Sequence, residues 1–385
     1  MSTTAAPVDE PLPSTALTRA APTPLGTTHD DFVHMNTAHC ESGVTASLLA
    51  DAGHPIGEPM AFGVGGGLFF AHMPFAKIMG LPLTTFRSFP GTLFSSAAKR
   101  LGVRFTSESF RNADVGMARL DTLLDQGRRV GLQVNIFWLD YIPRQLRIHF
   151  NAHNLIVVER RQDAYLVSDP VVEELYECSA DSLRRARFSG GAKVWGSGRL
   201  YYPDELPEQL ELRGAVLGGL RQVCHRMLRI PRVVPWFGVQ GIGHLAKQVE
   251  RWPQTQGEER AREYLASVVR MQEEIGTGGA GFRYLFGAFL QQAAEQLAWP
   301  QLEDMAEPAT QVGDHWRRWA LHASRMARGK PSQDWPELAE GLRDMASRER
   351  AFLEELDRVR TAGPPPRRVP QLPDPNASHH ESNPG

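Results

Sequence analysis

The chain has 385 residues, of which 42% are hydrophobic and 22% charged, a composition typical of a globular protein with a substantial core and about two domains. The formal net charge of −2 provides no basic surface, so neither nucleic acid nor an anionic membrane is expected as a partner. Three widely spaced cysteines predict neither a disulfide framework nor a zinc site, and we expect a cytoplasmic protein without a bound metal.

Composition divides the chain into four segments. Residues 1–28 are rich in Ala, Pro and Thr without the apolar core of a signal peptide, and they predict a disordered leader. Residues 362–385, rich in Pro and polar groups, predict a disordered tail. Residues 29–205 mix helix and strand patterns, whereas residues 206–350 carry helical patterns alone. The expected fold class is therefore α+β, with an all-helical C-terminal domain.

The first half of the chain begins with helical patterns. Apolar spacing predicts a helix after Cys40, a second over residues 95–101 and a third over residues 116–126. Asp114 is the expected cap of the third helix and Gly127 its expected end.

Strand patterns follow. Residues 130–138 predict one buried strand. Residues 154–158 and 165–168 are apolar runs separated by a short polar stretch, which is typical of a β-hairpin. In the second half, the helical stretches lie at residues 258–274, 283–298 and 312–328.

Cys40 is the first candidate for chemistry because it lies at the expected start of a helix. The positive end of the helix dipole favours thiolate over thiol and so lowers the pKa of a cysteine there, and the thiolate is the nucleophilic form. Glu41 falls in the first helical turn, where an acidic residue is favoured whatever its function. His39 is adjacent to Cys40 and is therefore a neighbour of the site rather than its base.

A base for Cys40 could come from His149 or His153, and His153 is the better candidate because it opens a strand. The next strand ends at Asp169, and the start of one hairpin strand lies beside the end of the other. The Asp169 carboxylate should therefore orient the His153 imidazole and stabilise its protonated form. The alternative is a buried cysteine, a surface histidine and an Asp-Pro turn, with no chemistry.

Two glycine-rich segments each allow two interpretations. Residues 63–67 are not followed by the Lys-Ser/Thr of a phosphate-binding loop, so they predict either a close backbone approach to substrate or to the Cys40 helix, or a flexible turn. Residues 276–281 predict a helix end and restart. They could also form an anion-binding nest of backbone N–H groups, with Thr277, Gly278 and Arg283 as its residues.

Several of these motifs together resemble a known family. The segments 39–42, 57–63, 65–68, 153–158 and 167–170 resemble the N-terminal domain of the butirosin biosynthesis protein H family. The helical half, with Gly-Thr-Gly-Gly-Ala-Gly-Phe-Arg ending at Arg283, resembles the helical domain of unknown function that often follows it. The resemblance extends over most of the chain between the leader and the tail.

The resemblance implies a papain-like fold of the kind found in bacteriocin leader peptidases. It also implies an acyltransferase of natural-product biosynthesis with Cys40, His153 and Asp169 as its catalytic triad. Such an enzyme moves an acyl group from a carrier-protein thioester to the amine of a small molecule. The expected partner is therefore an acyl or peptidyl carrier protein, whose phosphopantetheine arm is part of the substrate, and no bound cofactor is expected.

The oxyanion hole departs from the papain-like pattern. Those enzymes have a glutamine six residues before the nucleophile, and this chain has His34 there. Asn36 is the expected replacement, beside the backbone N–H of Cys40. The other residues expected on the substrate side are His39, Glu41, Glu58, Gly65 and Gly66.

Two rival functions remain open at this stage. A cysteine hydrolase, either a peptidase or an amidase, would use the same triad with water as the acceptor. A non-catalytic binding or carrier-docking protein would have lost the chemistry, and the intact triad argues against that. The acyl group and the acceptor amine are not specified by the sequence.

Overall fold

The computed structural model describes residues 25–78, 80–189, 198–231, 233–330 and 334–365. The chain forms two compact units that alternate along the sequence. The cysteine unit contains the chain up to Pro55 together with Arg104–Glu205, and the helical unit contains Ile56–Val103 and everything from Leu206 onward. Residues 56–103, expected in the first domain, thus lie in the helical unit, because their helices and hairpin pack against its C-terminal helices.

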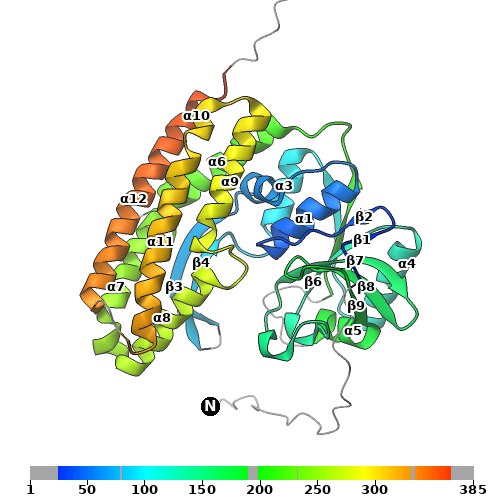
Figure 1. Cartoon of the computed structure of the whole chain (residues 1–385), viewed down its shortest axis with the longest axis horizontal. Coiled ribbons are helices and arrows are strands. Elements are labelled where there is room, and N and C mark those ends of the chain that lie inside the picture. Colours follow the sequence, from blue (N-terminus) through cyan, green and yellow to red (C-terminus); the bar gives the residue numbers. More distant parts are fainter. Residues whose placement is uncertain (1–24, 79, 190–197, 232, 331–333, 366–385) are drawn as a thin grey trace, which may run out of the picture. The chain divides into compact units, whose positions relative to one another are not determined.

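The cysteine unit is built on a six-stranded sheet in which every neighbouring pair is antiparallel (Figure 1). In spatial order the strands are β5 (Arg104–Glu108), β10 (Leu200–Glu205), β6 (Val130–Val134), β7 (His153–Arg161), β8 (Ala164–Ser168) and β9 (Tyr176–Ser179). The predicted hairpin is present as β7–β8. The strand predicted over residues 130–138 ends earlier, because the Asn135 side chain accepts the Phe137 N–H and turns the chain into the 3-10 helix η1 (Ile136–Trp138).

Helices cover both faces of this sheet. On one face, alternate side chains of the strands form a core with α4 (Ala113–Asp125) and α5 (Ala180–Phe188). On the other face lies α1 (Cys40–Asp51), which packs mainly against β7. The cap of α4 is Asn112 rather than the predicted Asp114, because its side-chain oxygen accepts the N–H groups of residues 114 and 115. The remaining elements are β1 (Thr28–His29), β2 (Phe32–Val33) and η2 (Arg144–Leu146).

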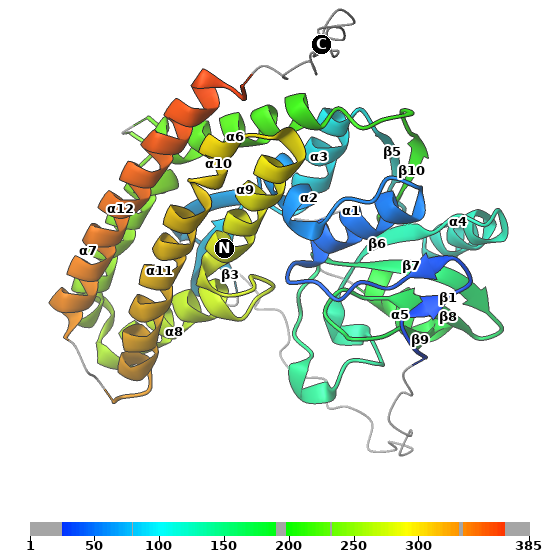
Figure 2. The same cartoon turned by 45° about the horizontal axis from the view of Figure 1, so that its top comes forward.

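The helical unit combines two short helices and a hairpin from residues 56–103 with the C-terminal helices (Figure 2). The first group contains α2 (Glu58–Val64), β3 (Leu68–Ile78), β4 (Leu81–Arg87) and α3 (Leu93–Leu101). The second contains α6 (Leu212–Leu228), α7 (Gly238–Gln256), α8 (Glu258–Glu273), η3 (Ala280–Phe282), α9 (Arg283–Leu297), α10 (Pro300–Glu303), α11 (Ala306–Ala327) and α12 (Trp335–Ala362). As predicted, every named element after Leu206 is helical, although α12 continues past residue 350.

The β3–β4 hairpin was not predicted from the sequence, and its burial explains why. The first six residues of β3 are all buried, so the strand shows no alternation of apolar and polar residues. Helix α7 packs against β3 and α8 packs against β4. A strand covered in this way reads as a continuous apolar run, which periodicity cannot distinguish from a buried helix.

The two ends of the chain are described only in part. Most of the predicted leader and tail, residues 1–24 and 366–385, lies outside the described residues. Of the rest of the leader, the Leu25 N–H donates to the Leu175 carbonyl and Thr28 belongs to β1. Among the described residues, no helix combines the length and the apolar character needed to cross a membrane.

The first glycine-rich segment serves helix packing within the helical unit. A Cβ on Gly63 would lie 2.0 Å from Cγ of Phe289 on α9. A Cβ on Gly219 of α6 would lie 2.3 Å from the Gly63 carbonyl oxygen. The backbone of α2 therefore packs directly against the backbone of α6 and against an aromatic ring of α9. The close backbone approach predicted for this segment is real, but its partners are these two helices.

We expect Gly219→Ala to destabilise the protein by about 1–3 kcal/mol, because the new methyl group overlaps the backbone of α2. Gly243→Ala on α7 is the matched control, since a Cβ there meets no atom within 4 Å. That control should raise stability by about 0.5–1 kcal/mol through helix propensity. Urea denaturation followed by circular dichroism measures both, and equal midpoints for the two variants would contradict the packing role.

Candidate active site

Cys40 is the first residue of α1, and the chain immediately before it fixes where the helix starts. His39 is the N-cap in an extended conformation, and its Nδ1 accepts the Ser42 N–H at 3.3 Å. Cys40 therefore occupies the first turn of the helix, where the dipole stabilises a negative charge. His39 thus uses Nδ1 to cap the helix, and its expected place as a neighbour of the site rather than the base stays a prediction.

The β7–β8 hairpin brings His153 and Asp169 together. His153 opens β7, and Asp169 directly follows the last residue of β8. The His153 Nε2–H donates to Asp169 Oδ2 at 2.8 Å, and both side chains are almost completely buried. The same carboxylate accepts the Tyr141 O–H at 2.6 Å and the Val171 N–H at 3.2 Å. Three donors thus hold the carboxylate that the sequence analysis proposed as the orienting group.

The charges around His153 favour its protonated form. Burial alone would lower the pKa of its imidazole, but the Asp169 carboxylate and a hydrogen bond with Cys40 raise that pKa to about 10. Because Nε2 bonds Asp169, Nδ1 is the nitrogen left to face the Cys40 sulfur. The pKa of Tyr141 is raised by burial and by Asp169, so its phenol remains a donor. The arrangement can therefore hold a thiolate–imidazolium pair backed by a carboxylate.

The segment before Cys40 is bonded to the loop after Asp169. His34 donates from Nε2 to the Val172 carbonyl at 3.0 Å and pairs through Nδ1 with the Ser168 hydroxyl at 2.8 Å. Asn36 donates its amide N–H groups to the carbonyls of Pro170 and Val172, at 3.2 and 2.8 Å. The structure thus corrects the oxyanion role expected for Asn36, because its donors hold the loop that carries the carboxylate.

Asn154 is a polar contact of Cys40 that the sequence analysis missed. Its Nδ2 lies 3.7 Å from the Cys40 sulfur and donates to the Ala152 carbonyl at 3.1 Å. The residue had been read only as part of an apolar strand. The available signal was chemical: an amide inside a run of buried apolar residues must find hydrogen-bond partners, and here the Cys40 sulfur is one of them.

The other residues expected on the substrate side are divided between the two units. Glu41 is the second residue of α1 and is completely buried. Glu58 opens α2 in the helical unit. Gly65 and Gly66 also lie in that unit, where their carbonyls accept the Gln222 amide at 3.3 and 3.4 Å. The two glycines therefore contact α6, and the substrate role expected for them stays a prediction.

The proposed anion nest at residues 276–281 already has internal partners. Arg283 is 1% exposed and donates from Nε to Glu349 at 2.7 Å. The Gly279 N–H donates to the Thr277 hydroxyl at 3.0 Å, and the Ala280 N–H donates to the Glu273 carboxylate at 3.2 Å. Gly278 contributes a positive φ of 61° to the turn. The prediction of an external anion at Thr277, Gly278 and Arg283 is corrected, because carboxylates of the protein take that place.

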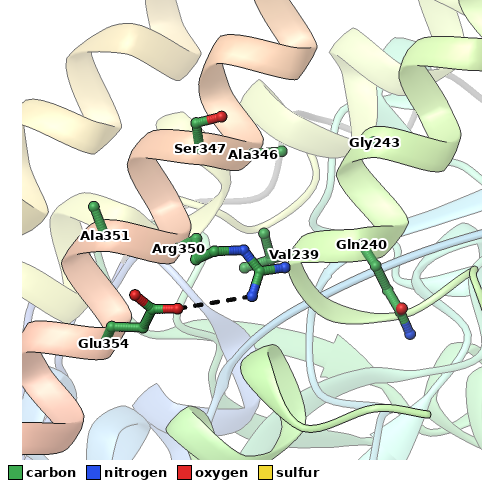
Figure 3. Close-up of a pocket in the computed structure, with 8 residues that line it drawn as sticks. All are labelled: Val239, Gln240, Gly243, Ala346, Ser347, Arg350, Ala351 and Glu354. Atoms are coloured by element: carbon green, nitrogen blue, oxygen red, sulfur yellow. Dashed lines mark ion pairs between the residues drawn. The ribbon is translucent and has the colours of Figure 1, made fainter. Parts of the chain in front are cut away.

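Beyond these residues, the helical unit has a groove of about 320 Å³ between α7 and α12 (Figure 3). Small side chains line much of it, and its charged residues, Arg350 and Glu354, pair with each other at 3.8 Å. Across the described part of the chain, no cluster of three or more His, Cys, Asp or Glu residues could hold a metal ion.

Comparison with known families matches two parts of the chain. Residues 39–170, which include Cys40, His153 and Asp169, match the family described as butirosin biosynthesis protein H, N-terminal. Residues 181–356 match a domain of unknown function, DUF4872. No curated protein matches the chain.

The two family matches do not coincide with the two structural units. The butirosin biosynthesis protein H match includes Ile56–Val103, which belongs to the helical unit. The DUF4872 match begins within α5 and contains β10, the strand that joins β5 to β6 in the cysteine unit. In this chain, each unit is therefore completed by segments from both matched regions.

We expect Asp169→Asn to slow the alkylation of Cys40 by iodoacetamide at pH 6 by about tenfold or more. Loss of the carboxylate charge lowers the pKa of His153, so less imidazolium is present to stabilise the thiolate. The pH of half-maximal alkylation should rise by at least about one unit. Peptide mass spectrometry separates Cys40 from the internal controls Cys178 and Cys224, both buried. An unchanged profile would show that Asp169 does not support the sulfur.

We expect Glu349→Gln to destabilise the protein by about 3 kcal/mol, because it leaves the buried Arg283 charge without a counter-charge. Glu354→Gln on the same helix is the control. Its partner Arg350 is exposed, so its loss should change stability by less than about 0.5 kcal/mol. Thermal unfolding with and without about 10 mM phosphate tests the rival role, an anion site, because a bound ligand stabilises the folded protein by mass action. If phosphate stabilises the wild type but not Arg283→Met, the interpretation of this segment as an anion site would be correct after all.

Proposed function

We propose that this protein is a cysteine acyltransferase of natural-product biosynthesis, with the papain-like arrangement of a nucleophile at a helix start and a histidine at a strand start. The observation that carries the proposal is the line of side chains from Cys40 through His153 to Asp169, with 2.8 Å between imidazole and carboxylate. The match of residues 39–170 to the N-terminal domain of butirosin biosynthesis protein H supports a biosynthetic role.

In the first half-reaction, the Cys40 thiolate attacks the carbonyl of an acyl thioester carried on the phosphopantetheine arm of an acyl or peptidyl carrier protein. The new bond joins sulfur to the acyl carbon, and the bond from that carbon to the pantetheine sulfur breaks. His153, held protonated by Asp169, gives its proton to the departing thiolate. The backbone N–H of Cys40, at the start of α1, is the group that we assign to stabilise the developing oxyanion.

In the second half-reaction, a small-molecule amine attacks the acyl-enzyme. His153 is now neutral and accepts the proton that the amine loses, while the Cys40 thiolate leaves. The product is an amide, and the thiolate–imidazolium pair is restored. Exchange between two thioesters is nearly thermoneutral, so the formation of the amide drives the overall reaction.

The preference for an amine over water is what separates a transferase from a cysteine hydrolase. Both reactions use the same three side chains, and the family relationship favours transfer. A binding protein without chemistry would gain nothing from a buried His153–Asp169 pair, whose desolvation costs free energy.

The test uses the full chain and an acyl N-acetylcysteamine thioester as the probe. Intact-protein mass spectrometry should show one acyl adduct on the wild type and none on Cys40→Ala. Cys178→Ala is the control and should retain the adduct. A primary amine chase should release amide faster than buffer alone releases acid. Dominant free acid would indicate a hydrolase, and full turnover by Cys40→Ala would end the proposal.

A further inference from the structure

The sheet of the cysteine unit places a tyrosine from a distant strand beside the Cys40 site. Strand β6 lies between β10 and β7, with Tyr201 of β10 opposite Gly131 and Asn154 of β7 opposite Gln133. Gly131, Tyr201 and Asn154 face the side of the sheet that carries α1, because their neighbours Leu132, Leu200 and Leu155 face the opposite core.

Gly131 leaves the space that lets Tyr201 reach across β6. A Cβ on residue 131 would lie 2.6 Å from Cε2 of the Tyr201 ring, closer than real carbon contacts allow. The ring therefore rests over the backbone of β6 at this glycine. Its hydroxyl then donates to Asn154 Oδ1 at 2.9 Å, one strand further on. Burial, Glu41 and Cys40 raise the pKa of Tyr201 well above its usual value, so the hydroxyl keeps its proton.

The two ends of the Asn154 amide are thus fixed separately. The Tyr201 hydroxyl binds the oxygen, while the nitrogen donates to the Ala152 carbonyl at 3.1 Å and lies 3.7 Å from the Cys40 sulfur. Because a carbonyl can only accept, the nitrogen and not the oxygen must face Ala152 and the sulfur. A thiolate gains more from such a donor than a thiol does, since a hydrogen bond to a charged acceptor is stronger.

We propose that Asn154 is a catalytic residue whose amide N–H stabilises the Cys40 thiolate, and that Tyr201, seated over Gly131, is the positioning residue that orients it. The proposal rests on the proposed function in one respect, namely that the Cys40 sulfur is the nucleophile. It adds a fourth and a fifth residue to the Cys40–His153–Asp169 line. Tyr201 lies in the DUF4872 match, outside the butirosin biosynthesis protein H match.

The experiment measures the pH profile of Cys40 alkylation by iodoacetamide in the full chain. Asn154→Ala removes the donor, and at pH 7 we expect alkylation about tenfold slower than in the wild type. Tyr201→Phe keeps the ring over Gly131 and removes only the hydroxyl, and we expect an effect of about fivefold. In both variants the profile should shift to higher pH. The double variant should match Asn154→Ala alone, because the tyrosine acts through the amide.

Tyr202→Phe is the matched control. It is the next residue of β10, faces the opposite core, and accepts a bond from Arg119 at 3.2 Å. It should leave the alkylation profile unchanged. A wild-type profile for Asn154→Ala would overturn the role of the amide, and equal profiles for Tyr201→Phe and Tyr202→Phe would overturn that of the tyrosine. Alkylation needs no acyl substrate, so a protein that alkylates as expected but transfers no acyl group refutes the proposed function alone.

Discussion

The buried pair between His153 and Asp169 is the interaction on which the rest of the cysteine unit depends. An imidazolium and a carboxylate are costly to remove from water, and they persist only where further hydrogen bonds compensate. Tyr141 and Val171 donate hydrogen bonds to the carboxylate, and the Cys40 sulfur forms a hydrogen bond with the other side of the His153 ring. The hairpin register and the start of α1 must both be correct for these groups to meet. The bonds from His34 and Asn36 to the loop after Asp169 hold that register in place.

The parts of this site that the sequence predicted are local. The helix after Cys40 and the hairpin that joins His153 to Asp169 each follow from apolar patterns and turn residues within about twenty positions. Asn36 was misplaced because spacing from Cys40 cannot show which way a side chain points. Asn154 and Tyr201 were missed because their role depends on β10 pairing with β6, a contact between residues far apart in sequence.

Both glycine-rich segments show the same limit. The close approach predicted at Gly63 is present, yet the sequence could not show that Phe289 and Gly219 are the partners. At residues 276–281, backbone N–H groups and Arg283 do bind anionic groups, and these are Glu273 and Glu349 of the protein itself. The kind of contact that each motif makes could be predicted from the sequence, whereas its partner could be identified only from the fold. The alternation of the chain between two units could not be predicted either, because no change in composition occurs at Pro55 or Val103.

The position of β10 between β5 and β6 has a consequence for folding during synthesis. Strands β5 and β6 are made early but have no hydrogen bonds to each other; they are joined only when β10 arrives between them. Residues 56–103 likewise wait for helices that the ribosome makes after Leu206. The cysteine unit thus has all of its chain once Glu205 is made, whereas the helical unit needs chain from both sides of it, so the cysteine unit can fold first. Tyr201 is among the last residues of the cysteine unit to leave the exit tunnel, so its bond to Asn154 beside the Cys40 sulfur forms late in synthesis.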